Sequence, residues 1–307
     1  MRLAASGREG CETAVYDAPM RLLVLLLTAC ACGFQVSCSS TGEPAEVATA
    51  TGRERAAVEA AVRAHLSLAP GAALGRADFA RVNELDLTGA PVTDAGAAWL
   101  ADRATGFTAL ATLDLSGTEV TDAGLACLAH DTSGLTSLRT LYLMRTRVTD
   151  SGLAALARSG SSLRDLTKLN VHTTGVTDAG LRVIAREGTG LAALTALNVG
   201  GTRVSDEGLK DLARPGTGLS SLSTLDIGAT QVTDAGLAKL AHPDTGLGNL
   251  ADLYLYKTAL TDVGIRSLVG PGTGLPRLRF LMLTDTMVTD EGVAAAKAHV
   301  PGLTIRR

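Results

Sequence analysis

Eight aspartates recur at one spacing in this chain, and a row of carboxylates could in principle bind cations. Each stands in a Val-Thr-Asp-x-Gly segment, with Leu260 and Ser205 as the variants at the first two positions, and the segments begin every 28 residues. The aspartates are Asp94, Asp122, Asp150, Asp178, Asp206, Asp234, Asp262 and Asp290. We favour a second interpretation, in which each Thr-Asp begins a helix. There a hydroxyl or carboxylate accepts hydrogen bonds from free N–H groups at the positive end of the helix dipole.

Other segments that could carry chemistry are incomplete. Residues 270–275 (Gly-Pro-Gly-Thr-Gly-Leu) resemble part of a phosphate-binding loop, but Leu275 stands where the lysine would be. Similar segments at 187–191, 215–219 and 244–247 share its phase, so we interpret all of them as helix-to-strand turns. The sequence contains no His-Glu-x-x-His motif and no nucleophile elbow. It therefore predicts no catalytic residues, no metal site, no cofactor and no enzyme.

The elements that position these residues follow from the 28-residue unit, L-x-x-L-x-L-x-x-T-x-V-T-D-x-G-L-x-x-L-A. Its first half alternates apolar and polar residues, as in Leu113-Asp114-Leu115, which predicts a short strand with one buried face. Its second half, as in residues 124–129, places apolar residues three apart among alanines and predicts a short helix. One unit cannot bury both apolar edges alone, so neighbouring units must stack.

These residues resemble the leucine-rich repeat family over about residues 80–305. The resemblance is to the ribonuclease-inhibitor-like or cysteine-containing type, and in particular to bacterial repeats with Thr-Asp-x-Gly-Leu. It implies an α/β leucine-rich-repeat solenoid, a horseshoe or arc of eight repeats plus terminal caps, with a parallel concave β-sheet and convex helices. The family's Asn or Cys after the strand is Thr here, as at Thr118 and Thr202. We expect the hydroxyl to satisfy backbone groups in that turn.

The chain divides into five parts by composition. We expect an N-terminal extension and export signal over residues 1–38, with Met20 as a possible true start, and a flexible tether over 39–52. An N-terminal cap over 53–81, the repeats over 82–293 and a C-terminal cap over 294–307 follow.

The N-terminal part predicts export. Arg21 precedes an apolar run that is too short to span a membrane comfortably. Leu27-Thr28-Ala29-Cys30 resembles the lipobox of bacterial lipoproteins, in which the cysteine carries lipid, and Cys38 is the alternative. We expect an exported protein anchored by lipid at the cell envelope, at the outer membrane or surface. The alternative is a secreted or periplasmic protein.

Net charge bears on the partner. A formal charge of -3 and a pI near 6.0 do not favour nucleic acid, which needs a strongly basic face.

Outward residues that depart from the repeat are the candidate site, because function resides in such deviations. Tyr, Arg and Met are enriched at protein interfaces. One predicted patch lies near the C-terminal end, where Tyr254 should neighbour Met282, and a second lies about four strands away. Gly200, Gly201, Gly228 and Ala229 between them should leave room for a protruding partner. The alternative is that aromatic residues merely favour strands. The candidate residues are Tyr142, Met144, Arg145, Arg147, His172, Tyr254, Tyr256, Lys257, Phe280, Met282 and Asp285.

Together these patterns predict a monomeric, non-enzymatic module that binds a protein or peptide through the concave sheet. Two alternatives remain open. One is a structural or scaffold envelope lipoprotein without a discrete ligand site. The other, more remote, is an adaptor that resembles the substrate-recognition repeats of ubiquitin ligases.

Overall fold

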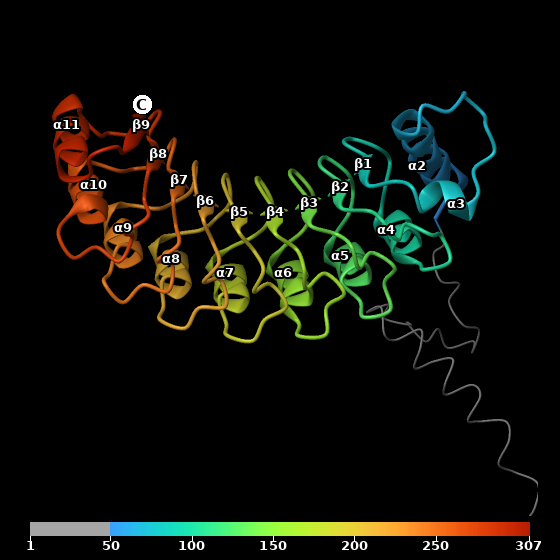
Figure 1. The fold of residues 1–307 in the computed structure, drawn as a ribbon, viewed down its shortest axis with the longest axis horizontal. Helices are drawn as coiled ribbons and strands as arrows, with labels where there is room; N and C mark the ends of the chain where they lie inside the picture. Colours follow the sequence, from blue (N-terminus) through green and yellow to red (C-terminus); the bar gives the residue numbers. More distant parts are fainter. Residues whose placement is uncertain (1–49) are drawn as a thin grey trace, which may run out of the picture. The chain divides into compact units, whose positions relative to one another are not determined.

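The computed structural model describes residues 50–307, which form one curved array of strand-helix units (Figure 1). The strands line the inner side of the arc and the helices its outer side. The elements are α2 (Gly52–His65), α3 (Arg76–Phe79), β1 (Glu84–Asp86), α4 (Asp94–Ala101), β2 (Thr112–Asp114), α5 (Asp122–Leu128), β3 (Thr140–Tyr142), α6 (Asp150–Ala157), β4 (Lys168–Asn170), α7 (Asp178–Ile184), β5 (Ala196–Asn198), α8 (Asp206–Leu212), β6 (Thr224–Asp226), α9 (Asp234–Leu240), β7 (Asp252–Tyr254), α10 (Asp262–Val269), β8 (Phe280–Met282), α11 (Asp290–His299) and β9 (Thr304–Arg306). The predicted fold class, a leucine-rich-repeat α/β solenoid arc, is confirmed.

One parallel sheet runs through the whole array in the order β1 to β9. Each residue of β1 to β7 pairs with its counterpart 28 positions later, as Leu85 does with Leu113. The central residue of a strand points into the core, and Leu113 and Leu141 are fully buried. The first and third residues point away from the core, because side chains alternate along a strand. No helix of residues 50–307 lies over this face, whereas most parallel sheets are covered on both faces.

The core is a continuous column of Leu, Val and Ile side chains between the sheet and the helices. The threonine that follows each strand helps to close it. The Thr202 hydroxyl donates to the Val199 carbonyl oxygen at 2.5 Å, and Thr118 makes the same bond to Leu115 at 2.6 Å. The predicted role of these hydroxyls is confirmed.

An aspartate that begins one helix binds the beginning of the next, and we call this contact the inter-repeat clasp. Asp150 Oδ1 accepts from the Thr177 backbone N–H at 2.8 Å, and Asp150 Oδ2 accepts from the Thr177 hydroxyl at 2.7 Å. The Thr177 hydroxyl oxygen accepts in turn from Ala179 N–H in its own helix. The helix-capping interpretation is therefore confirmed, with the carboxylate capping the neighbouring helix. Within residues 50–307 the clasp is made by Asp94, Asp122, Asp150, Asp178, Asp206, Asp234 and Asp262.

The clasp explains the glycine of the Thr-Asp-x-Gly motif. A Cβ at Gly180 would lie 2.5 Å from Asp150 Oδ1, closer than such atoms can approach. The glycine therefore makes room for the carboxylate of the preceding repeat. Its backbone is helical, so glycine is required for this close approach and not for a left-handed conformation.

At the N-terminal end of the array, a residue from outside the regular repeats takes the place of the clasp aspartate. Glu54 of α2 is 2% exposed, and its Oε1 accepts from the Thr93 N–H at 2.9 Å and the Thr93 hydroxyl at 2.7 Å. Burial alone would raise the pKa of Glu54, but these bonds and those from Thr51 lower it to about 2. At the other end Asp290 pairs with Arg307.

Candidate binding site on the concave sheet

Polar residues at the third strand position shape the inner face of the sheet. Asn198 Oδ1 accepts from the Gly200 N–H at 2.8 Å, and Asp226 Oδ1 accepts from the Gly228 N–H at 2.9 Å. Such Asx turns fix the backbone where each strand ends. Tyr142 and Tyr254 occupy the same register position and cannot make this bond, so their rings stand at either end of a run of Asn and Asp.

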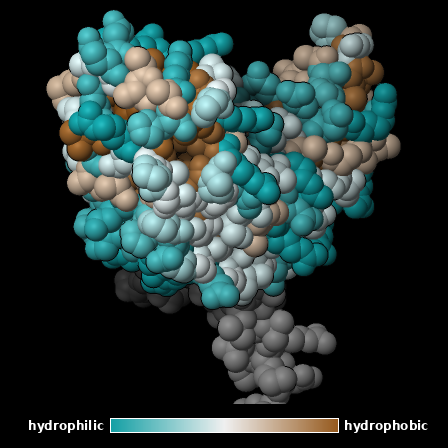
Figure 2. Space-filling model, turned by 60° about the vertical axis from the view of Figure 1, so that its left-hand side comes forward, coloured by the Kyte–Doolittle hydropathy of each residue, from teal (hydrophilic) through white to brown (hydrophobic). Residues whose placement is uncertain are grey.

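Four of the predicted site residues lie in strands, and three of these form the patch predicted near the C-terminal end. Tyr254 pairs in register with Met282, as predicted. The Tyr254 and Phe280 ring centroids are 5.3 Å apart, and the Arg306 guanidinium carbon lies 5.9 Å from the centroid of the Phe280 ring. Figure 2, with the C-terminal end turned forward, shows hydrophobic patches on a largely hydrophilic surface. Tyr142 lies four strands away, in β3.

Four other predicted residues lie at the rim beyond the strands. Arg145, Lys257 and Asp285 have φ values of 54°, 53° and 58°. This left-handed conformation normally favours glycine. Arg147 lies farther along the rim, where its guanidinium is 3.7 Å from the Glu119 carboxylate and both side chains are exposed.

The space expected above the paired small residues is filled by the protein itself, which corrects that prediction. Tyr256 lies across Gly228, where a Cβ would meet its ring at 2.3 Å, and its hydroxyl reaches Gly200. The hydroxyl lies 3.3 Å from Nε2 of His172, which comes from a turn three repeats earlier. His172 Nδ1 in turn lies 2.7 Å from the Thr173 hydroxyl. We call the Tyr256–His172 contact the aromatic brace. Its residues, with Met144, follow the strands by two positions.

A carboxylate that sequence reasoning missed lies beside the brace. Asp226 Oδ2 accepts from Asn198 Nδ2 at 2.9 Å. Burial raises the pKa of Asp226, and the Gly228 N–H, the charge of His172 and the Asn198 amide offset part of that effect. Burial, together with the charge of Asp226, also raises the pKa of Tyr256. The only sequence signal for Asp226 was its place in the row of third strand positions.

A shallow depression of about 220 Å³ lies between the two tyrosines. Strand residues from β3 to β7 line it, and several are charged or amide side chains. They are Tyr142, Lys168, Leu169, Asn170, Ala196, Leu197, Asn198, Thr224, Asp226 and Tyr254. We call this depression the tyrosine-flanked hollow. It joins the two predicted patches through residues that were not singled out from the sequence.

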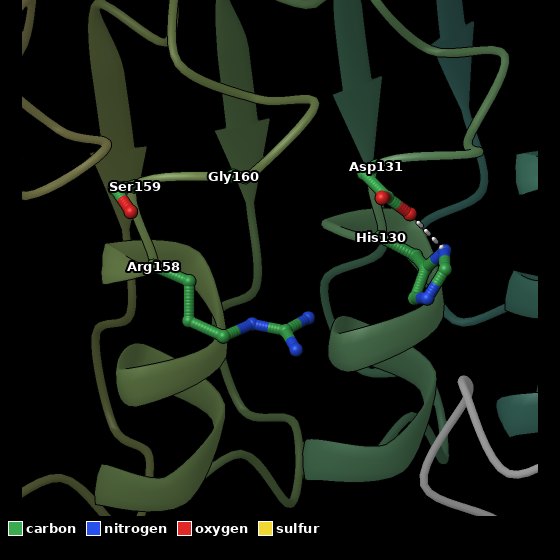
Figure 3. Close-up of a pocket in the computed structure, with 5 residues that line it drawn as sticks. All are labelled: His130, Asp131, Arg158, Ser159 and Gly160. Carbon is green, nitrogen blue, oxygen red and sulfur yellow. Dashed lines mark ion pairs between the residues drawn. The ribbon is translucent and has the colours of Figure 1, made fainter.

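A second depression, of about 410 Å³, lies on the turns after α5 and α6 (Figure 3). His130 Nδ1 lies 2.9 Å from Asp131 Oδ1, and Arg158 extends from the next turn toward them. Thr132 N–H also donates to His130 Nδ1. These contacts are local to the turns, so we do not assign the depression a function.

Two further findings concern the described residues. Over residues 50–307, no group of three or more His, Cys, Asp or Glu side chains is arranged to hold a metal ion. No helix in that range has both the length and the apolar character needed to cross a bilayer. Cys30 and Cys38, the candidate lipidation residues, lie outside the described residues.

Comparison with known proteins agrees with this geometry. A family model described as Leucine Rich repeat matches four segments, residues 109–129, 134–157, 192–213 and 218–241. No curated protein matches the chain. Leucine-rich repeats generally mediate protein–protein binding and are typically non-catalytic scaffolds. The four matched segments, the shared period and the single parallel sheet together support a leucine-rich-repeat protein.

Proposed function

We propose that this protein is a non-enzymatic module that binds an extended segment of a protein or peptide on its concave sheet. The observation that carries the proposal is the tyrosine-flanked hollow on the face of the sheet that no helix of the described residues covers. Tyr142 and Tyr254 offer apolar rings with polar tips, the side-chain type most often central to protein interfaces.

The size of the hollow favours a partner side chain over an enclosed small molecule. Its volume of about 220 Å³ is below the roughly 300–1,000 Å³ of small-molecule pockets. Its tyrosines lie four strands apart, about 19 Å at 4.8 Å per strand. A chain laid across the strands would contact both rings and place one or two side chains in the hollow.

The brace residues bear on an enzymatic alternative, because a histidine beside a hydroxyl can activate a nucleophile. Thr173 has a φ of 55° and contacts His172. The same φ occurs at Ala229, which has no hydroxyl, so the conformation belongs to the repeat. The other ring nitrogen of His172 faces the Tyr256 hydroxyl, whereas the histidine of a Ser-His-Asp triad is oriented by a carboxylate. We therefore interpret the histidine as structural.

Selection of peptides from a random display library on the full chain tests the proposal. Selected peptides should bind the double variant Tyr142→Ser/Tyr254→Ser at least about tenfold more weakly, since truncating an aromatic anchor commonly costs 2 kcal/mol or more. Val263→Ser is the matched control, because Val263 is an apolar residue of the convex helix α10 and is 55% exposed. Equal binding to the double variant and the wild type would overturn the proposal.

We also propose that the protein is exported and held at the cell envelope by lipid on Cys30, with Cys38 as the alternative. The support is the apolar run after Arg21 and the small residues before each cysteine. Expressed from Met1 in a bacterium, the protein should partition into the detergent phase. The Cys30→Ser/Cys38→Ser variant should remain in the aqueous phase, and each single variant identifies the lipidated residue. Partition that persists in the double variant refutes the anchor, and an aqueous wild type indicates a secreted or periplasmic protein.

A further inference from the structure

Asp226 is a half-buried carboxylate of the tyrosine-flanked hollow. Its two oxygens accept from the Gly228 N–H and from Asn198 Nδ2, each at 2.9 Å. Both donors are neutral. Over residues 50–307 no Lys, Arg or His side chain forms an ion pair with this carboxylate. Burial raises the pKa of Asp226, as expected for a carboxylate whose charge is incompletely compensated.

The neighbouring strand shows a carboxylate with a cationic partner. Asp252 of β7 pairs with Arg279, whose Nε lies 3.2 Å from Asp252 Oδ1. Asp226 of β6 lies next to Tyr254, the other residue of β7 that faces the same side. The hollow thus places a carboxylate without an ion-pair partner in residues 50–307 beside an aromatic ring, and His172 acts on it only through space.

The charged strand residues of the whole inner face also favour a cationic partner. Among the first and third residues of the nine strands, five are acidic and two are basic. The acidic ones are Glu84, Asp86, Asp114, Asp226 and Asp252, and the basic ones are Lys168 and Arg306. Lys168 is exposed and lies two strands from Asp226, and within residues 50–307 no ion pair joins the two side chains. It leaves the carboxylate available to an incoming cation.

We propose that the hollow receives an arginine side chain of the partner, with Asp226 as its counter-charge and Tyr254 as the ring on which the guanidinium stacks. The inference rests on the proposed function and names the chemistry that the hollow selects. Arginine suits it better than lysine, because the planar guanidinium both stacks on a ring and presents a fork of N–H donors to a carboxylate. An acidic segment would be repelled by the same face.

Asp226→Asn removes the charge and keeps the backbone bond at the strand end, while its NH2 group replaces the oxygen that accepts from Asn198 Nδ2. Asn170 and Asn198 occupy the equivalent position in β4 and β5, and each accepts the same backbone bond, from His172 N–H at 2.9 Å and from Gly200 N–H at 2.8 Å. Asparagine at position 226 can therefore accept the same backbone hydrogen bond that Asn170 and Asn198 accept. Asp114→Asn is the matched control, since Asp114 accepts the same bond from Ser116 N–H but lies on β2, outside the hollow.

The probes are two synthetic peptides, acetyl-Gly-Ser-Arg-Ser-Gly-amide and the same peptide with citrulline for arginine. Citrulline keeps the shape of arginine and removes its charge. Titration of the full chain, followed by NMR, should give about tenfold tighter binding of the arginine peptide, since a hydrogen bond to a charged group contributes about 1.5–3 kcal/mol. Asp226→Asn should reduce the ratio of the two affinities to near one, and Asp114→Asn should preserve it. Equal affinities in the wild type, or a ratio that survives Asp226→Asn, would overturn the inference.

The library selection separates failure of this inference from failure of the proposed function. Selected peptides that need Tyr142 and Tyr254 but contain no excess of arginine support the binding module and contradict the arginine site. Selected peptides that bind the Tyr142→Ser/Tyr254→Ser variant unchanged contradict both.

Discussion

The Tyr256 hydroxyl lies 3.3 Å from His172 Nε2, although 84 residues separate them in the sequence. The contact depends on Gly200 and Gly228, which supply no Cβ under the tyrosine ring. Tyr256 is thus held against the sheet, where the charge of Asp226 acts on its hydroxyl.

Gly228→Ala should displace Tyr256 from the sheet. The new Cβ would lie 2.3 Å from the ring, and the side chain can swing away from it, so we expect a stability loss of only about 1 kcal/mol. The main effect should be on the pKa of Tyr256, which burial raises and which should fall toward its ordinary value of 10.0. NMR titration of the tyrosine rings measures it. In Gly160→Ala, where no atom lies within 4 Å of the new Cβ, the Tyr256 titration should not change. An unchanged pKa in Gly228→Ala would contradict the brace.

Gly180→Ala should destabilise the protein although alanine favours helix by about 1 kcal/mol. Its Cβ would lie 2.5 Å from Asp150 Oδ1, so we expect a net loss of about 2 kcal/mol in urea unfolding. Asp150→Ala should also destabilise, because it removes the acceptor of two bonds from Thr177. In the double variant the collision is absent, so its loss should be smaller than the sum of the single losses. Additive losses would show that glycine serves another purpose there.

Glu54 should make stability depend on pH in acid. Its pKa in the folded protein is about 2 against an ordinary value of 4.5, so its ionised form stabilises the folded state above pH 4.5. This contribution, up to about 3 kcal/mol from the shift, disappears as the pH falls from 4.5 to about 2. Glu54→Gln should therefore unfold at lower urea than the wild type at pH 7, and the difference should shrink over that range.

Glu59→Gln is the control for this measurement. Glu59 lies on the same helix and pairs only with Arg63, at 2.9 Å, so its loss should cost less than about 1 kcal/mol. A difference between Glu54→Gln and the wild type that is constant with pH would contradict the assignment.

Arg145→Gly should stabilise the fold and weaken binding. Arg145 has a φ of 54°, while Gly89, Gly117 and Gly201 occupy the same position in other repeats. Glycine there should add about 1 kcal/mol in thermal unfolding, because it removes the strain of the left-handed conformation. Under the proposed function, selected peptides that reach the rim should bind this variant more weakly. Arg147→Gly, at a position without positive φ, should give no gain in stability. Destabilisation by Arg145→Gly would contradict the strain argument.

Periodicity alone could predict the strands, the helices and the neighbours across the sheet, because a fixed 28-residue unit places every residue beside its counterpart. It predicted the pairing of Tyr254 with Met282 and the bond made by the Thr202 hydroxyl. It could not predict how an exposed side chain lies, since the pattern constrains only buried positions. The sequence signal for the brace is the row His172, Gly200, Gly228 and Tyr256. From the sequence we interpret the two glycines of this row as space for a partner and the two ring residues as binding residues.

Glu54 was missed for a different reason. It belongs to a helix outside the repeats, and a glutamate three residues after Thr51 also has an ordinary local role as a capping box, which it fulfils. Its second role is to supply Thr93 with the carboxylate that a preceding repeat would supply. This role follows only from the packing of α2 against the first repeat.

The inter-repeat clasp also bears on how such an array can change in length. Because each aspartate of the clasp acts on the unit that follows it, a whole 28-residue unit can be duplicated or deleted and each helix start still finds its carboxylate. The aromatic brace does not tolerate such a change, because one more unit between His172 and Tyr256 would move the histidine out of contact with the tyrosine hydroxyl. Lineages that carry this protein should therefore vary in repeat number outside residues 172–256 and keep a constant number within them.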